Sequence, residues 1–276
     1  MKEKKDIRSL SIEELTSFFK SNNMPSYRAN QVYNWLWKKS CLSFDEMTNI
    51  SLELRNLLKS KFVINHIKID KLQKSKDGTI KNAISLYDNL LVESVLIPTK
   101  SRTTACISSQ VGCSLDCDFC ATSKMDRIRN LNPDEIYDQA VTINSQSIKY
   151  HDRPISNIVF MGMGEPLLNY SNVIKGIDKI TSKEGLGMSP KRITVSTSGI
   201  SKLIIKMADD NVKFNLAISL HSAIEKTRNK IMPFSKKFPL ENLLEAVKYW
   251  YLKTNKIVTY EYIVWEGIND DEDHIN

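Results

Sequence analysis

The first sixty residues carry apolar side chains at the spacing of amphipathic helices. Ser11 precedes Glu14 at the distance of a capping box, which predicts a helix beginning at this point. A second helix is expected to begin near Tyr27, and a third to span roughly residues 50–62. The pattern therefore predicts a small helical accessory domain over residues 1–62.

Residues 63–98 read as strands instead of helices. Asp77-Gly78 is a hairpin signal, because both residue types tolerate the backbone of a tight turn. Residues 80–87 and 90–97 are strand-like in composition. We expect a β-hairpin extension over this part of the chain.

From residue 99 onward, short β-branched or apolar segments alternate with helix-length amphipathic segments. The expected strands are residues 104–108, 157–161, 192–195, 214–220 and 258–264. The expected helices are residues 133–146, 173–181, 202–209 and 240–253. Such alternation implies parallel strands with right-handed crossovers, so the fold class is α/β and an open or closed barrel is expected over residues 99–276.

The last residues begin another such unit. The run from Asn269 to Asp273 is typical of a helix N-terminus with acidic residues in its first turn, and the sequence stops three residues later. We therefore expect a chain that is truncated at its C-terminus.

Basic charge is concentrated towards the N-terminus. Net charge is +7, and residues 1–90 hold 16 Lys and Arg against 10 Asp and Glu, whereas the other 186 residues hold 23 against 22. This distribution suits a domain that meets a polyanion such as RNA. A merely solubilising lysine-rich surface would look the same, so charge alone leaves both interpretations open.

The second predicted helix holds an aromatic and basic run. Tyr33, Trp35 and Trp37 are followed by Lys38 and Lys39. Aromatic rings and lysines suit RNA contact, but the helical period places at least Trp35 in the core. We expect Trp35 to be buried and keep RNA contact for the two lysines as a hypothesis.

Composition indicates a folded, cytoplasmic protein. Apolar residues make up 41% of the 276, enough for a core in one large domain, or in one domain with a small accessory one. The first ten residues are charged and lack the apolar segment of a signal peptide. No apolar run is long enough to span a bilayer, so no membrane partner is expected.

Three cysteines lie within eight residues in the order Cys113-x3-Cys117-x2-Cys120. Three thiolates on one loop can bind three irons of a cubane cluster and leave the fourth iron open to another ligand. Zinc is the alternative, but structural zinc sites are closed by four ligands, which would require a partner such as Cys106 or His221. Without a secretion signal, either kind of metal site is favoured over a disulfide framework.

Polar residues also follow the later predicted strands. Gly164 and Glu165 belong to the run Met-Gly-Met-Gly-Glu-Pro after the second strand, where glycine permits close backbone approach and the carboxylate can accept from an ammonium. The third and fourth strands are followed by Ser196, Ser219, Leu220 and His221. A serine or histidine at one strand end is usually a cap, but successive strand ends assemble sites in barrels.

The aromatic Phe119 directly before Cys120 completes the pattern C-x3-C-x-aromatic-C, which resembles the radical S-adenosylmethionine (SAM) superfamily. The resemblance implies a [4Fe–4S] cluster on the three cysteines whose open iron binds SAM, and a reductase or flavodoxin-type electron donor. It also implies that Gly164 and Glu165 hold the methionyl amino group of SAM. The remaining SAM contacts would be Phe119, Ser196, Ser219, Leu220 and His221.

Four further runs narrow the resemblance to the dual-specificity adenine-C2 methyltransferases of 23S rRNA and tRNA. They are residues 104–113, 161–166, 231–233 and 261–264. The resemblance implies that Cys106 resolves a covalent protein–RNA adduct by forming a disulfide, and that Glu93 is the proton acceptor. From pattern alone, a buried strand thiol is the favoured interpretation of Cys106, and a solvent-facing carboxylate is the alternative interpretation of Glu93.

The resemblance further implies methyl transfer through a methylated cysteine near the C-terminus, which a SAM-derived radical activates. No cysteine follows Cys120 in this sequence, and five of six expected barrel strands are found. We therefore expect a partial (β/α)6 barrel, in a monomer that binds a cluster but does not methylate RNA. A complete gene product that has lost catalysis is the other explanation.

Three functions remain as alternatives to adenine-C2 methylation. The related adenine-C8 rRNA methyltransferases share the cysteine loop, but they tend to carry alanine where this chain has Pro166. A radical SAM enzyme acting on a small molecule or a protein would not need the basic N-terminal domain. A non-catalytic, metal-containing RNA-binding protein is the third.

Overall fold

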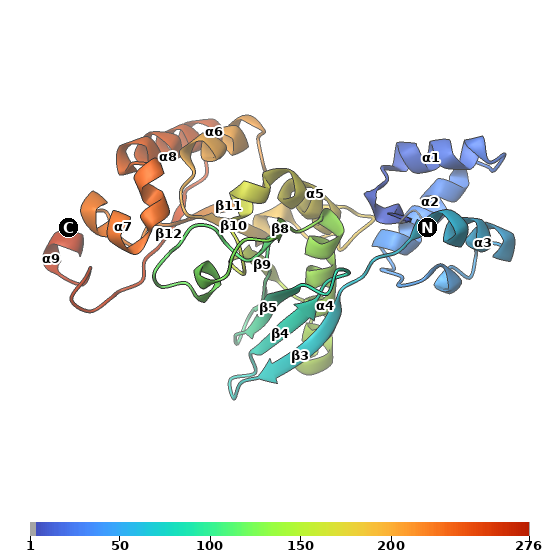
Figure 1. The fold of residues 1–276 in the computed structure, drawn as a ribbon, viewed down its shortest axis with the longest axis horizontal. Coiled ribbons are helices and arrows are strands. Elements are labelled where there is room, and N and C mark those ends of the chain that lie inside the picture. The colour runs from blue at the N-terminus through green and yellow to red at the C-terminus, as the bar shows by residue number, and fades with distance from the viewer. Residues whose placement is uncertain (1–3, 276) are drawn as a thin grey trace.

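The computed structural model describes residues 4–275. Three helices form an N-terminal module: α1 (Ile12–Ser21), α2 (Tyr27–Trp37) and α3 (Leu52–Lys61). The predicted capping box is present, because the Ser11 hydroxyl accepts from the amide of Glu14 at 3.2 Å and the Glu14 carboxylate accepts from the amide of Ser11 at 2.7 Å. The module lies at one end of the molecule, away from the C-terminal helices (Figure 1).

The central sheet has eight strands in the order β12-β11-β10-β9-β6-β5-β4-β3. Its parallel strands are β6 (Thr103–Cys106), β9 (Asn157–Phe160), β10 (Ile193–Thr197), β11 (Asn215–Ser219) and β12 (Thr259–Glu261). Its antiparallel strands are β3 (Lys68–Lys74), β4 (Ile80–Ser85) and β5 (Leu91–Pro98). The five predicted barrel strands are therefore present, and the hairpin strands extend the same sheet.

The strand β12 is shorter than the predicted residues 258–264. After Glu261 the chain leaves the sheet and turns around Asn269, whose side-chain amide donates to the carbonyl of Ile263 at 2.8 Å. The Tyr262 hydroxyl donates to the carbonyl of Asn269 at 2.8 Å. These two hydrogen bonds hold residues 262–269 in a loop, so the residues after Glu261 do not continue the pairing with β11.

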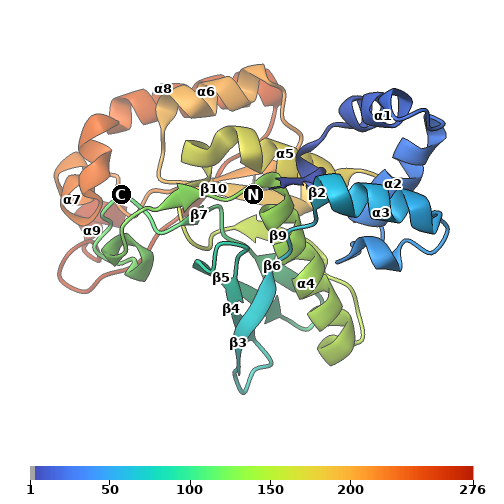
Figure 2. The same ribbon diagram turned by 45° about the vertical axis from the view of Figure 1, so that its right-hand side comes forward.

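Four helices connect or follow the parallel strands: α4 (Pro133–His151), α5 (Tyr170–Thr181), α6 (Ser201–Asp209) and α8 (Leu240–Thr254). Two short helices, α7 (Glu225–Ile231) and α9 (Glu272–Ile275), lie near the C-terminus. Figure 2 shows α6 and α8 side by side above β10, with α4 beside the end of the sheet formed by β3–β5. The helix α7 was not predicted, because it is only seven residues long and has no capping side chain.

Two short strand pairs complete the fold. The strands β1 (Lys5–Asp6) and β2 (Phe62–Val63) pair in parallel and close the N-terminal module. The strands β7 (Gln110–Val111) and β8 (Arg129–Asn130) pair antiparallel. Since β7 and β8 flank the three cysteines, they clamp the two ends of the cysteine loop to each other.

The N-terminal module is bound to α4 by a buried ion-pair network. Arg8 donates to both oxygens of Asp138, at 2.8 and 2.9 Å, and to Asp134 at 3.1 Å. Burial raises the pKa of Asp138 to about 6, and Arg8 opposes this rise. Removing one partner of such a network would leave an uncompensated buried charge, which typically costs about 3–5 kcal/mol.

The prediction that Trp35 is in the core holds only in part, because Trp35 is partly buried against the core whereas Trp37 is fully buried in it. Trp37 is 1% exposed and meets the ring of Tyr137 on α4 edge to face, with centroids 5.3 Å apart. Trp35 is only partly buried, its indole N–H donates to Asn49 at 2.6 Å, and the Lys39 ammonium lies 3.5 Å from its ring centroid. The buried face of α2 is turned towards α4. The spacing of apolar residues within α2 does not contain this contact, so it could not predict which tryptophan is fully buried.

Candidate active site

The C-terminal ends of the parallel strands meet at one edge of the sheet and enclose a cavity of about 440 Å³. Most residues predicted from the sequence line it. These are Cys113, Cys117, Phe119, Cys120, Gly164, Glu165, Ser196, Ser219 and His221. Residues up to 108 positions apart in the chain therefore share one site, as expected for a barrel whose strand ends carry the chemistry.

The cysteine loop is held by its own backbone. Gly112 has φ +72°, and a Cβ atom there would lie 2.0 Å from the carbonyl oxygen of Asp126, so only glycine fits. The Ser123 hydroxyl donates to the carbonyls of Cys117 at 2.6 Å and Cys120 at 2.7 Å. These contacts fix the loop without using the thiols.

The thiols lie in a poorly solvated place. Burial, and then the neighbouring thiols, raise the pKa of Cys117 to about 12, and burial also raises the pKa of Cys113. Such thiols are protonated when free, whereas a bound metal deprotonates a coordinating thiol outright. Among residues 4–275, no group of three or more His, Cys, Asp and Glu side chains is close enough together to hold one metal ion. A cubane cluster instead takes one thiolate on each of three irons.

Two glycines after β9 allow two segments of the chain to pack closely beside the cysteine loop. A Cβ atom on Gly162 would lie 2.6 Å from the Ser108 hydroxyl oxygen, and one on Gly164 would lie 2.4 Å from Cβ of Gln110. Gly164 also has φ +91°. The loop after β9 therefore packs directly on the segment before the cysteines, which only residues without a Cβ atom permit.

The Glu165 carboxylate is 3% exposed and accepts two backbone amides, from Leu167 at 2.9 Å and from Ser198 at 2.8 Å. Burial raises its pKa, and these hydrogen bonds oppose the rise. A carboxylate oxygen has further lone pairs, so each can accept a second donor. A bound ammonium would favour the charged form of Glu165.

His221 follows β11 with φ +57°, an unusual backbone for histidine. Its ring meets that of Phe119, and its Nδ1 accepts from the amide of Ile263 at 3.2 Å. Burial, and then the charge of Arg228, lower its pKa to about 4. His221 is therefore neutral at pH 7, and because its Nδ1 accepts a hydrogen bond, its proton is on Nε2.

Ser196 and Ser219 share a partner that was not selected from the sequence. Their hydroxyls donate to the same oxygen of Glu261, Oε2, at 2.8 and 3.0 Å. Glu261 lies opposite Ser219 in the β11–β12 register, and its carbonyl accepts the amides of Leu220 and His221. Residues 261–264 belong to a run that carries the family resemblance in the sequence. The contacts of the Glu261 carboxylate could not be predicted from that run, because they depend on β10, β11 and β12 being neighbours in the sheet.

Glu93 and Cys106 do not line the cavity but lie on adjacent strands beside it. Cys106 pairs with Val95, and Glu93 is two residues before Val95 on β5, so both side chains are on one face of the sheet. The Glu93 carboxylate is 2.7 Å from the ammonium of Lys81. Burial raises the pKa of Cys106 to about 11. All five cysteines are free thiols.

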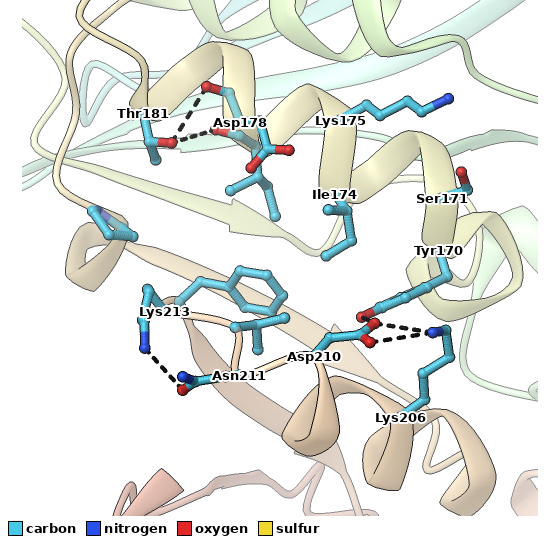
Figure 3. A pocket seen from close by; sticks show the side chains of 14 residues that line it. Tyr170, Ser171, Ile174, Lys175, Asp178, Thr181, Lys206, Asp210, Asn211 and Lys213 are labelled. Atoms are coloured by element: carbon cyan, nitrogen blue, oxygen red, sulfur yellow. Dashed lines mark hydrogen bonds and ion pairs between the residues drawn. The ribbon is translucent and has the colours of Figure 1, made fainter.

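A larger cavity, about 700 Å³, lies between α5 and the end of α6 (Figure 3). It contains no residue predicted to act on SAM or RNA. Three of its polar groups bind one another, because the Tyr170 hydroxyl donates to Asp210 at 2.5 Å and the Lys206 ammonium lies 3.1 Å from the same carboxylate. We assign no role to this cavity.

Comparison with known proteins identifies the family. Residues 5–64 match the ribosomal RNA large subunit methyltransferase N-terminal domain, and residues 107–276 match the radical SAM superfamily. A probable dual-specificity RNA methyltransferase RlmN of Flavobacterium johnsoniae is 66% identical over 98% of this chain and 77% of its own length. This chain belongs to the RlmN family of radical SAM RNA methyltransferases.

A more distant relative and a solved structure support the same family assignment. A dual-specificity RNA methyltransferase RlmN of Syntrophus aciditrophicus is 43% identical over 98% of this chain and 76% of its own length. The crystal structure of a radical SAM methyltransferase from Sphaerobacter thermophilus superimposes with a TM-score of 0.90 at 32% identity, covering 98% of this chain and 79% of that one. The radical SAM fold is thus shared, and the protein is a radical SAM RNA methyltransferase by family.

Membership of the superfamily implies a [4Fe–4S] cluster and SAM. The cavity fits both groups: three thiols line one side, and a carboxylate and hydroxyls line the others. The family also implies RNA as substrate. No helix within residues 4–275 has the length and apolar character to cross a membrane.

Proposed function

We propose that this protein is an adenine-C2 methyltransferase of 23S rRNA and tRNA that acts through a methylcysteine. The observation that carries the proposal is the single cavity that joins the cysteine loop to Glu165 and to the strand-end hydroxyls. Such a cavity suits SAM, which presents an amino group, a carboxylate and a ribose. The RlmN relatives supply the RNA substrate class.

The cavity residues that were predicted from the sequence each have a role in this proposal. Cys113, Cys117 and Cys120 would hold the cluster, which when bound supplies the electron that cleaves SAM. Glu165 would accept from the amino group of SAM through lone pairs that its two backbone donors leave free. Neutral His221 would donate from Nε2. Phe119, Gly164, Ser196, Ser219 and Leu220 would complete the SAM contacts.

The residues beside the cavity would act on the RNA base. Glu93 would accept the C2 proton, and its carboxylate lies 2.7 Å from the ammonium of Lys81. Cys106 would release the methylated base by forming a disulfide with the cysteine that carried the methyl group. That partner is not among the 276 residues, since none after Cys120 is a cysteine. We therefore propose that these residues perform the SAM-cleaving half of the reaction.

The RNA is proposed to approach across the basic N-terminal module. Lys39 lies over Trp35 and is exposed beside Lys38. We propose a monomer that works in the cytoplasm, with a flavodoxin-type protein as electron donor.

Anaerobic reconstitution with iron and sulfide tests the proposal. With SAM and dithionite, the loaded protein should release 5′-deoxyadenosine, and zinc-loaded protein should not. Loss of this product in Cys117→Ser, but not in Cys41→Ser, would tie it to the loop. A loaded protein that never cleaves SAM would refute the proposal.

A second assay distinguishes C2 from C8 chemistry. A chain of the length of its relatives, incubated with 23S rRNA fragments and tRNA, should yield 2-methyladenosine by mass spectrometry. Formation of 8-methyladenosine would show that the C8 alternative is correct. The same assay on the 276 residues should give neither product.

A further inference from the structure

A lysine patch lies on the outside of the segment that covers the cysteine loop. It consists of four exposed lysines of α7 and of the 3₁₀ turn η6 (Pro233–Lys237) that follows it, namely Lys226, Lys230, Lys236 and Lys237. The first two are four residues apart, so they lie on one face of α7. Within the described residues 4–275, no carboxylate forms an ion pair with any of these four ammonium groups.

The charge of this segment differs from that of the rest of the barrel. Residues 225–237 hold five Lys and Arg against one Glu, whereas the remainder of residues 91–276 holds 18 Lys and Arg against 21 Asp and Glu. Counted together with the cysteine loop, residues 113–128, the surface still holds seven basic against four acidic residues. The lysine patch is therefore a local positive region on a barrel that is otherwise slightly acidic.

The inner side of the same segment touches the cysteine loop. The carbonyl of Ile231 accepts from the amide of Asp118 at 3.0 Å. Ile231 and Met232 are 2% and 1% exposed and pack in one buried cluster with Cys113 and Cys117. Met232 also lines the cavity. The segment therefore separates the cysteine site from solvent, with the lysines on its outer side.

This arrangement suits a partner protein that delivers an electron. Such a donor must bring its redox group close to the cysteines, and α7 and η6 cover them. A positive patch attracts an acidic partner and increases the rate of encounter, because exposed charges steer diffusion at low salt. Complexes between redox proteins bury little surface. A short helix surrounded by lysines is therefore a sufficient contact.

RNA is the other polyanion that a lysine patch attracts. The patch and the N-terminal module lie at opposite ends of the molecule (Figure 1). Glu93 and Cys106, which are proposed to act on the RNA base, lie on β5 and β6, whereas α7 follows β11, three strands further along the sheet. RNA that spans the module and Glu93 would leave the α7 end of the molecule uncovered.

We propose that the lysine patch is the docking surface for an acidic one-electron donor protein of the flavodoxin class. This rests on the proposed function, because it requires a cluster on the three cysteines. In the docked complex the reduced flavin of the donor loses one electron and the oxidised cluster gains it, and no atom is transferred. The lysines bind and orient the donor and do not touch the cluster.

Reduction of the cluster by two different reductants tests the docking surface. The cluster-loaded protein is mixed anaerobically with a fully reduced acidic flavodoxin or with photoreduced 5-deazariboflavin, a small uncharged reductant. Freeze-quenched samples are then scored for the electron paramagnetic resonance signal of the reduced cluster. Lys226→Glu/Lys230→Glu should lower the second-order rate with flavodoxin about 10- to 100-fold at low salt. Its rate with deazaflavin should equal that of wild type.

Salt and charge give two further checks on the patch variant. Its deficit should shrink as salt rises towards about 1 M, because exposed charges are then screened over a few ångströms. Lys226→Gln/Lys230→Gln, which removes the charge without reversing it, should lose only part of the rate. A deficit that persists unchanged at high salt would overturn the proposal, since the lysines would then not act through their charge.

The matched control makes the same change of charge elsewhere. Lys71→Glu/Lys76→Glu alters two exposed lysines of the β3–β4 hairpin, at the opposite edge of the sheet from β12. It should keep the wild-type rate with flavodoxin. A control as slow as the patch variant would show that net charge alone sets the rate. Equal rates in the patch variant and wild type would show that the donor docks elsewhere. Either result would overturn the proposal.

Binding of tRNA, measured by filter retention, separates the two polyanionic partners. Lys226→Glu/Lys230→Glu should bind tRNA as wild type does. A loss of tRNA affinity together with an unchanged flavodoxin rate would assign the patch to RNA and overturn the proposal. Iron content and thermal midpoint show that each variant folds and loads, and both should match wild type because the lysines are exposed.

Failure of the proposed function looks different from failure of this inference. In that case wild-type protein would take up no cluster and give no resonance signal with either reductant. A wild-type signal with deazaflavin but none with flavodoxin would defeat this inference alone.

Discussion

The ring of His221 meets the ring of Phe119 edge to face, with centroids 4.5 Å apart. Phe119 belongs to the cysteine loop, and His221 follows β11 at φ +57°. One aromatic contact therefore joins the loop proposed to hold the cluster to the strand end proposed to hold SAM. His221 is kept neutral by this environment, and its protonation state is accessible to measurement.

Stability should fall on acidification because of His221. Its pKa is about 4 in the folded protein against 6.5 for free histidine, so the unfolded chain binds more protons between these two values. The free energy of unfolding should fall as pH drops from 6.5 towards 4, by up to about 3 kcal/mol from this group. The free energy of unfolding can be measured by urea denaturation at several pH values for wild type and His221→Asn. It should depend less steeply on pH in the variant. Equal slopes would mean that His221 titrates normally.

Arg8→Met should loosen the N-terminal module from the barrel. The substitution leaves two buried carboxylates without their cation, and we expect a loss of about 3–5 kcal/mol in the free energy of unfolding. Arg55→Met is a control, since its guanidinium contacts only the carbonyl of Asp45 among the described residues. If both variants were equally stable, the buried network would contribute nothing.

Gly164→Ala should destabilise the site more than Gly187→Ala. Both glycines have positive φ, so both substitutions strain the backbone, but only at Gly164 would the new methyl group meet Gln110 at 2.4 Å. We expect the additional overpacking to cost about 1–3 kcal/mol and to reduce SAM affinity. Thermal unfolding and SAM binding are the measurements. A Gly187 variant as impaired as the Gly164 variant would show that φ alone matters.

Cys106 should react slowly with iodoacetamide. With a pKa of about 11 raised by burial, its thiolate fraction at pH 8 is about a hundredfold below that of an ordinary cysteine. The rate should rise steadily from pH 8 to pH 10, as measured by mass spectrometry of the Cys106 peptide. Fast alkylation at pH 7 would contradict the environment described for this thiol.

Local signals in the sequence could be predicted well. The capping box of Ser11, the turn at Asp77-Gly78 and the cysteine loop depend on residues a few positions apart, and each is present. The five parallel strands followed from their alternation with helices. Each of these is specified within one segment of the chain.

What could not be predicted depends on which segments become neighbours. The core position of Trp37 is determined by Tyr137, 100 residues later, and the hydrogen bonding of Glu261 by a serine 65 residues earlier. No periodicity within one helix or strand contains that information. The helix α7 was missed for another reason, because it lacks both length and a cap.

The pairing of Arg8 with Asp138 spans 130 residues of sequence. During synthesis at about 5–20 residues per second, the carboxylate is made roughly 7–26 seconds after the arginine. The N-terminal helices are therefore synthesised before α4, the helix on which they pack. Attachment of this module to α4 can therefore begin only after about half of the 276 residues have been synthesised.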